Sequence, residues 1–264
     1  MNLNIMSAFF TTEKGTLAGL DFFTVKSPAL KKRADVCIFR PEGLTNDSPI
    51  VILLHGVYGS SWSWALKAEV HQTLTKLISE GAIPPMLLVM PSDGHFDDGS
   101  AYLKHQTEDY EKWITEDVVS LAKEAYPELN DNSPIFLAGL SMGGYGALRL
   151  GAKHSAIFRA FSGLSSITCF GDHEAFLEDF DRLAVSVVKQ ENVLDVMLEN
   201  KATLPPFRFD CGENDTLFDA NLKLHQMLQE ASIHHEFHTY EGEHNWEYWT
   251  KNIESTLLFF AKNI

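Results

Sequence analysis

The sequence predicts an α/β fold with a mostly parallel, doubly wound sheet. Three short apolar runs have the length and composition of strands covered on both faces: 50–54, 86–91 and 134–139. Each is followed by a segment with apolar residues at helical spacing: 64–80, 107–126 and 142–154. Because strands that alternate with helices pair in parallel, most of the sheet should be parallel.

The two ends of the chain complete this pattern. The β-rich runs 20–25 and 34–40 flank a basic turn that contains proline, which predicts an antiparallel hairpin at a sheet edge. The C-terminal part predicts alternating strands and helices at 206–212, 217–231, 234–240 and 246–262.

The alternation stops between residues 165 and 205, where phenylalanines mix with acidic residues. Two short helices are expected there, at about 172–189 and 192–198. We interpret this segment as a helical insertion that lies over the strand ends, within a single domain formed by residues 1–264.

Composition excludes several classes of function. Lys and Arg number 21 against 36 Asp and Glu, a formal charge of −15 that opposes binding to nucleic acid or to an anionic membrane. The N-terminus lacks a basic region leading into an apolar run, so no export signal is expected there. No stretch approaches the ~20 apolar residues of a membrane span. Three widely spaced cysteines favour reduced thiols. A cytoplasmic protein is therefore expected, and a homo-oligomer is compatible with the sequence.

The segment Gly139-Leu140-Ser141-Met142-Gly143 fits the pattern G-x-S-x-G and lies between a predicted buried strand and a predicted helix. Glycines are needed there because the turn is too tight for side chains, and the turn exposes the serine hydroxyl at the edge of the sheet. The sequence therefore predicts Ser141 as a nucleophile. The alternatives are a glycine-rich turn with an idle serine, or a dinucleotide-binding loop, whose glycine spacing differs.

Two backbone N–H groups are candidates for stabilising an oxyanion. One belongs to Met142, at the N-terminus of the helix that follows Ser141. The other belongs to Val57, in the segment HGVYGS that follows the strand 50–54. His55 opens the same segment, and we expect it to fix the shape of the loop.

A serine nucleophile needs a histidine base and a carboxylate that orients this base. Asp215 lies in the loop after the strand 206–212, with Glu213 as its competitor, while Asp210 falls within the strand and Asp219 in the next helix. The base is predicted to be His244, which lies after the strand 234–240 and before the last helix.

No cofactor and no metal are expected. His234 and His238 alternate along one strand, but two histidines without a third ligand are more typical of an ordinary strand. Candidate pocket residues are Trp62, Phe170 and Phe176. The alternative is that the phenylalanines, with Phe180, anchor the insertion on the sheet, and that Trp62 and Trp64 serve packing.

The motifs HGVYGS, GLSMGGYGA, CGENDTLFDAN and YEGEHNWEYW, in this order, resemble the esterase D family of α/β-hydrolases, over nearly the whole chain. The resemblance implies the α/β-hydrolase fold, a triad of Ser141, Asp215 and His244, and oxyanion donors at Val57 and Met142. It is strongest to the cytoplasmic tributyrin-type esterases of short acyl chains. S-formylglutathione hydrolases of this family carry a cysteine-containing SGLTC-type segment in place of HGVYGS.

The expected function is that of a serine carboxylesterase that hydrolyses small esters with short, acetyl-like acyl groups through an acyl-enzyme. The first alternative is an S-formylglutathione hydrolase, which should strongly prefer that thioester. The second is a hydrolase-fold protein that has lost catalysis and serves as a binding module. A peptidase is compatible with the fold, but no residue supports it.

Overall fold

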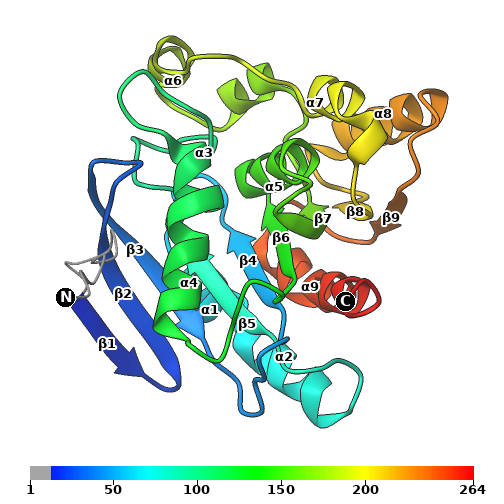
Figure 1. Ribbon diagram of the computed structural model, residues 1–264. Coiled ribbons are helices and arrows are strands. Elements are labelled where there is room, and N and C mark those ends of the chain that lie inside the picture. The colour runs from blue at the N-terminus through cyan, green and yellow to red at the C-terminus, as the bar shows by residue number, and fades with distance from the viewer. Residues whose placement is uncertain (1–12) are drawn as a thin grey trace.

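Strands β4 (Ile50–Leu54), β5 (Leu87–Pro91), β6 (Ile135–Leu140) and β8 (Phe207–Gly212) are buried at every position. They belong to a nine-stranded sheet in the computed structural model, which describes residues 13–264 (Figure 1). Apolar side chains on both faces of such strands must be covered, and this is why helices pack on both sides. The remaining strands are β1 (Glu13–Leu17), β2 (Leu20–Ser27), β3 (Lys32–Phe39), β7 (Phe158–Leu164) and β9 (Glu236–Tyr240).

The sheet has the order β1-β2-β3-β5-β4-β6-β7-β8-β9. The first three strands form an antiparallel meander that joins β5, and every pairing from β5 to β9 is parallel. The carboxyl ends of β4, β6, β8 and β9 therefore lie along one edge of the sheet. This topology confirms the α/β fold with a mostly parallel sheet and an antiparallel N-terminal hairpin.

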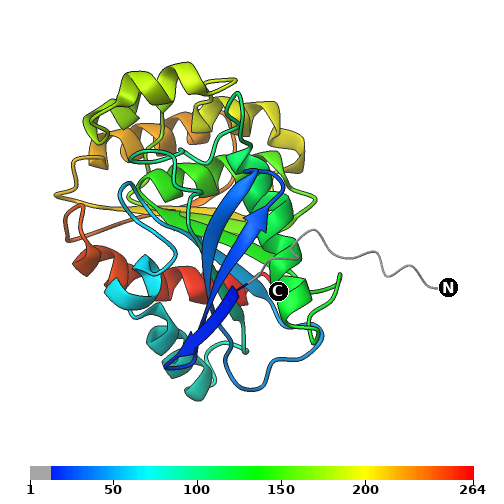
Figure 2. The same ribbon diagram turned by 90° about the vertical axis from the view of Figure 1, so that its left-hand side faces the viewer.

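Helices lie on both faces of the sheet (Figures 1 and 2). Two clusters of buried apolar side chains fill the space between the sheet and these helices. One face is covered by α1 (Ser63–Lys67), α2 (Val70–Ser79) and α9 (Trp246–Ala261). The other face is covered by the following helices: α3 (Tyr110–Lys112), η1 (Trp113–Val118), α4 (Val119–Ala125), α5 (Met142–Lys153), α7 (Val193–Glu199) and α8 (Phe218–Glu230). Between residues 13 and 264 no helix combines the length and the apolar character needed to span a bilayer. The expectation of no export signal concerns a segment that includes residues 1–12, which lie outside those described.

Two predicted helices are interrupted. The helix expected over 64–80 is divided into α1 and α2, because Glu69 adopts a left-handed conformation with φ of 47°. The helix expected over 107–126 begins only at Tyr110, and its middle, η1, is a π-helix. The spacing of apolar residues did not reveal either change, because the apolar positions on both sides of each interruption are still buried.

Two strands were not predicted. Strand β1 has the sequence EKGTL and is exposed at all five positions, so it lacks the alternation that marks a half-buried strand. Strand β7 is almost entirely buried, but its sequence FRAFSGL includes small residues and an exposed Arg159 that interrupt the apolar run.

The segment 165–205 contains one of the two helices expected, since α7 matches the helix predicted over 192–198. It contains the 3-10 helix η2 (Phe170–Ala175), α6 (Phe180–Ser186), α7 and η3 (Lys201–Thr203), and lies with α6 and α7 at the top of both ribbon views (Figures 1 and 2). The helix predicted over 172–189 is broken after Phe176. There the Phe176 carbonyl accepts a hydrogen bond from the Tyr58 hydroxyl (3.2 Å), and the Glu178 N–H donates to Asp98 (3.2 Å). These bonds tie the segment to the loops that follow β4 and β5.

A buried histidine holds η2 in place. The His173 side chain is 0% exposed, its Nδ1 donates to the Phe170 carbonyl (2.9 Å), and its ring packs edge-on against Tyr145. Its Nε2 has no hydrogen-bond partner within the part of the chain that is described. Burial lowers the pKa of His173 from 6.5 to about 4, so the imidazole is neutral in the folded protein.

Replacing His173 with Gln is expected to weaken the pH dependence of stability. Because the folded pKa is lowered, the unfolded chain binds this proton first, and stability is lost as the pH falls from about 6.5 towards 4. Between pH 7.5 and pH 5 the loss in free energy of unfolding should be about 2 kcal/mol smaller in the variant. Urea unfolding at both pH values measures this loss in the free energy of unfolding. The exposed control His234→Gln should keep the wild-type difference, and an unchanged difference in His173→Gln would contradict the assignment.

Candidate active site

Ser141 lies in the turn between β6 and α5, the position that the sequence predicts. Its backbone has φ of 55° and ψ of −120°, which is strained for a residue other than glycine. The flanking glycines make the turn feasible: a Cβ at Gly139 would lie 2.2 Å from the Gly143 carbonyl oxygen, and one at Gly143 would lie 2.4 Å from that of Leu54. The Ser141 N–H donates to the Leu164 carbonyl (3.0 Å), which fixes the turn against β7.

Ser141, His244 and Asp215 form a chain of hydrogen bonds. The His244 Nε2 lies 3.0 Å from the Ser141 Oγ, and the His244 Nδ1 lies 3.0 Å from each carboxylate oxygen of Asp215. Since Nδ1 faces a carboxylate, it carries the proton, and Nε2 is left as the acceptor for the serine hydroxyl. The arrangement can therefore remove a proton from the serine.

Asp215 is held as a carboxylate. Burial alone would raise its pKa, but the hydrogen bond and charge of His244 and the N–H of Leu217 (2.8 Å) together lower it below the ordinary value. A group with a lowered pKa stays ionised throughout the neutral range, as an orienting acid requires.

The other acidic candidates lie elsewhere. The exposed Glu213 accepts a hydrogen bond from the Thr239 hydroxyl (3.3 Å). Asp210 is buried within β8, pairs with Arg208 and accepts the Tyr248 hydroxyl (2.8 Å). Asp219 lies in the first turn of α8. Of the four, Asp215 is the one that hydrogen-bonds His244.

Val57 and Met142 carry the two predicted oxyanion donors. Gly56 brings the loop after β4 close to Ser141, because a Cβ at Gly56 would lie 3.2 Å from the Ser141 Cβ. Met142 is the first residue of α5, where N–H groups lack an acceptor in their own helix. Neither N–H has an acceptor among residues 13–264, so both are available to a ligand.

His55 shapes this loop, as expected. Its Nε2 accepts a hydrogen bond from the Asp93 N–H (2.9 Å), so its Nδ1 carries the proton and donates to the Gly56 carbonyl (2.7 Å). The side chain is 2% exposed, and burial lowers its pKa, which keeps the ring neutral.

A cavity of about 310 Å³ opens beside Ser141 and His244. Its other lining residues come from four segments and include five aromatic side chains: Gly56, Val57, Tyr58, Gly59, Trp62, Ser63, Lys67, Leu140, Phe176, Trp246 and Trp249. Of the candidate pocket residues, Trp62 (41% exposed) and Phe176 lie here, and the Phe176 ring is 5.3 Å from the His244 ring. Trp246 and Trp249 also line the cavity but were not predicted, although they lie only two and five residues after His244.

The prediction that Phe170 lines the pocket is wrong. Phe170 is 3% exposed and packs against Phe180 and His173, with ring centroids 5.5 and 5.7 Å away. It therefore anchors the segment 165–205 on the protein. The buried Trp64 likewise serves packing, and its indole N–H donates to the Leu54 carbonyl (3.0 Å).

Over residues 13–264, no group of three or more His, Cys, Asp and Glu side chains is placed to hold a metal ion. The His238 Nε2 lies 3.5 Å from a carboxylate oxygen of Glu236, and both exposed side chains belong to β9.

Fold and site together define the class of protein. A buried serine in a strained turn after a central strand, with an acid after β8 and a histidine after β9, is the arrangement of the α/β-hydrolase fold. A family model described as "Putative esterase" matches residues 27–260. The chain therefore belongs to the Esterase family and is a carboxylic ester hydrolase.

Individual proteins of known description share 18 to 24% sequence identity with the chain. The acetyl esterase of Caldicellulosiruptor saccharolyticus is 24% identical over 229 residues, which cover 80% of this chain and 82% of that protein. A ferulic acid esterase superposes with a TM-score of 0.79 at 24% identity, covering 93% of this chain and 98% of its own. An S-formylglutathione hydrolase from Staphylococcus aureus superposes with a TM-score of 0.75 at 18% identity, covering 95% and 99%. These structures share the fold.

Proposed function

We propose that this protein is a serine carboxylesterase that hydrolyses esters of short, acetyl-like acyl groups through a covalent acyl-enzyme. The observation that carries the proposal is the continuous hydrogen-bonded chain from Ser141 through His244 to Asp215. In this proposal Ser141 is the nucleophile, His244 the general base and then acid, and Asp215 the group that orients His244.

In the first step the Ser141 oxygen attacks the ester carbonyl while the His244 Nε2 takes its proton. The carbonyl oxygen becomes an oxyanion, and the N–H groups of Val57 and Met142 donate to it. His244 then gives the proton to the leaving alcohol, the C–O bond breaks, and the acyl group remains on Ser141.

In the second step His244 removes a proton from water, which attacks the acyl carbon. The second oxyanion is stabilised by the same two donors. When it collapses, His244 returns the proton to Ser141 and the carboxylic acid leaves. Asp215 stabilises the imidazolium that forms in each step.

The cavity and the relatives support a small substrate. About 310 Å³ must hold groups on both sides of the scissile bond, and five aromatic side chains line this space. The family relative described as an acetyl esterase supports a short acyl group. The S-formylglutathione hydrolase that shares the fold makes a small thioester the alternative substrate.

The rate of hydrolysis is expected to fall with acyl length. In a series of p-nitrophenyl esters, kcat/KM should be highest for acetate to butyrate and at least tenfold lower for laurate, whose chain extends beyond the cavity. S-formylglutathione is measured in parallel. A clear preference for laurate would contradict the short-chain proposal, and a kcat/KM far higher for S-formylglutathione would replace it with the thioester alternative.

A further inference from the structure

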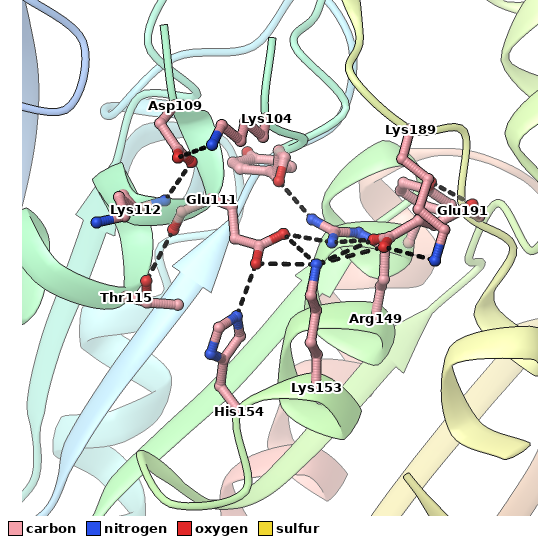
Figure 3. Close-up of polar contacts among 12 residues, drawn as sticks. Lys104, Asp109, Glu111, Lys112, Thr115, Arg149, Lys153, His154, Lys189 and Glu191 are labelled. Carbon is pink, nitrogen blue, oxygen red and sulfur yellow. Dashed lines mark hydrogen bonds and ion pairs between the residues drawn. The ribbon is translucent and has the colours of Figure 1, made fainter. Parts of the chain in front are cut away.

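A partly buried cluster of charged side chains surrounds Arg149 of α5 (Figure 3). Arg149 lies two turns after Ser141 and its side chain is 0% exposed. Its Nη1 donates to Glu111 (2.6 Å) and to Glu191 (2.7 Å). Lys153 lies between the two carboxylates, and His154 contacts Glu111 at 2.8 Å.

The cluster joins segments that are far apart in the sequence. Glu111 belongs to α3, Arg149 and Lys153 belong to α5, and Glu191 belongs to the loop between α6 and α7. Burial would raise the pKa of Glu111, but the hydrogen bond from His154 and the charge of Arg149 lower it well below its ordinary range. Both glutamates are therefore ionised, and Arg149 is fixed between two negative charges.

Arg149 also holds a strained piece of backbone. Its Nη2 donates to the Tyr102 carbonyl (2.5 Å). Tyr102 and the preceding Ala101 are both left-handed, with φ of 54° and 52°. Two consecutive residues of this kind, neither of them glycine, persist only where their surroundings hold them. Gly146 leaves room for the Tyr102 ring, since a Cβ there would lie 2.7 Å from it.

Tyr102 in turn contacts the loop that carries the proposed oxyanion donor. Its hydroxyl donates to the His55 carbonyl (3.0 Å), and the Tyr102 side chain is 0% exposed. His55 lies two residues before Val57. The contacts thus run without a gap from the carboxylates through Arg149 and Tyr102 to the loop after β4.

We infer that Arg149 and Tyr102 are positioning residues, which set the Val57 N–H at the distance and angle that the oxyanion needs. The inference rests on the proposed function. An oxyanion donor contributes to the transition state far more than to the bound ester, and its contribution depends steeply on geometry. Loss of positioning therefore lowers kcat and leaves KM nearly constant.

The test is Tyr102→Phe, which removes only the hydroxyl. With p-nitrophenyl acetate we expect kcat to fall roughly tenfold with KM within about twofold, and the inhibition constant of phenylboronic acid to rise in parallel. The control is Tyr126→Phe. Tyr126 is also buried, and its hydroxyl donates to Asp21 (2.7 Å) far from the site. The kcat of this variant should match that of the wild type. Melting temperatures of both variants show whether any loss comes from unfolding.

A double-mutant cycle connects Arg149 to the same effect. Arg149→Lys keeps a charge but loses the donor to Tyr102, and should lower kcat by tenfold or more. If both residues act through one path, Arg149→Lys/Tyr102→Phe has the kcat of Arg149→Lys alone. Wild-type kcat in folded Tyr102→Phe, or independent losses that multiply, would overturn the inference. An active Ser141→Ala protein would instead overturn the proposed function itself.

Discussion

The Ser141→Ala variant is expected to lose on the order of a million-fold in kcat for p-nitrophenyl acetate. Without the Oγ that lies 3.0 Å from His244, no acyl-enzyme can form, and only the oxyanion donors and substrate binding remain. The fold should be kept, because alanine fits the space of serine and the backbone strain is unchanged. The control is Ser162→Ala, a buried serine of β7 whose hydroxyl contacts Thr256, which should keep its activity if it folds.

Covalent labelling checks the same residue independently. A fluorophosphonate should add one phosphonyl group to the wild-type protein, with fluoride as the leaving group, and mass spectrometry of peptides should locate it on Ser141. The Ser141→Ala protein should stay unlabelled. Activity of that variant above about 1% of wild type, or a label on another residue, would assign the nucleophile elsewhere.

The fold and the residues of the site could be read from local patterns. Ser141, Asp215 and His244 each lie just beyond the end of a strand, and a parallel sheet brings such positions to one edge. Glycines at 139 and 143 mark a tight turn whatever the rest of the chain does. These signals depend on neighbours in the sequence, and this is why they could be recognised.

Other features depend on tertiary contacts, which the sequence does not display. Arg149 contacts Glu111 and Glu191 across 38 and 42 residues, and its own place in a helix of small residues suggests an exposed charge. The break after Phe176 arises from hydrogen bonds to Tyr58 and Asp98. These two residues lie in loops that precede the break by about 80 residues or more. Phe170 and Phe176 look alike in the sequence, yet one is core and the other lines the cavity.

The Asp215→Asn variant should lower kcat by about ten thousand-fold while the protein stays folded. An amide can hold the ring of His244 through either its oxygen or its NH₂ group. The NH₂ group would favour the tautomer with the proton on Nε2, which cannot accept the serine proton. Even in the correct tautomer, a neutral partner leaves the imidazolium of the transition state without a counter-charge. Steady-state kinetics with p-nitrophenyl acetate measures the loss.

Glu213→Gln is the matched control, since Glu213 lies two residues away and was the competing acid. It bonds to Thr239 and is exposed, so its activity should stay within a fewfold of wild type. The pH profile separates the two roles further: Asp215 has a lowered pKa and remains charged above pH 5, so titration of this carboxylate cannot produce an acid limb between pH 5 and 8. A large loss in Glu213→Gln with a small one in Asp215→Asn would exchange their assignments, and would require the loop after β8 to rearrange when substrate binds.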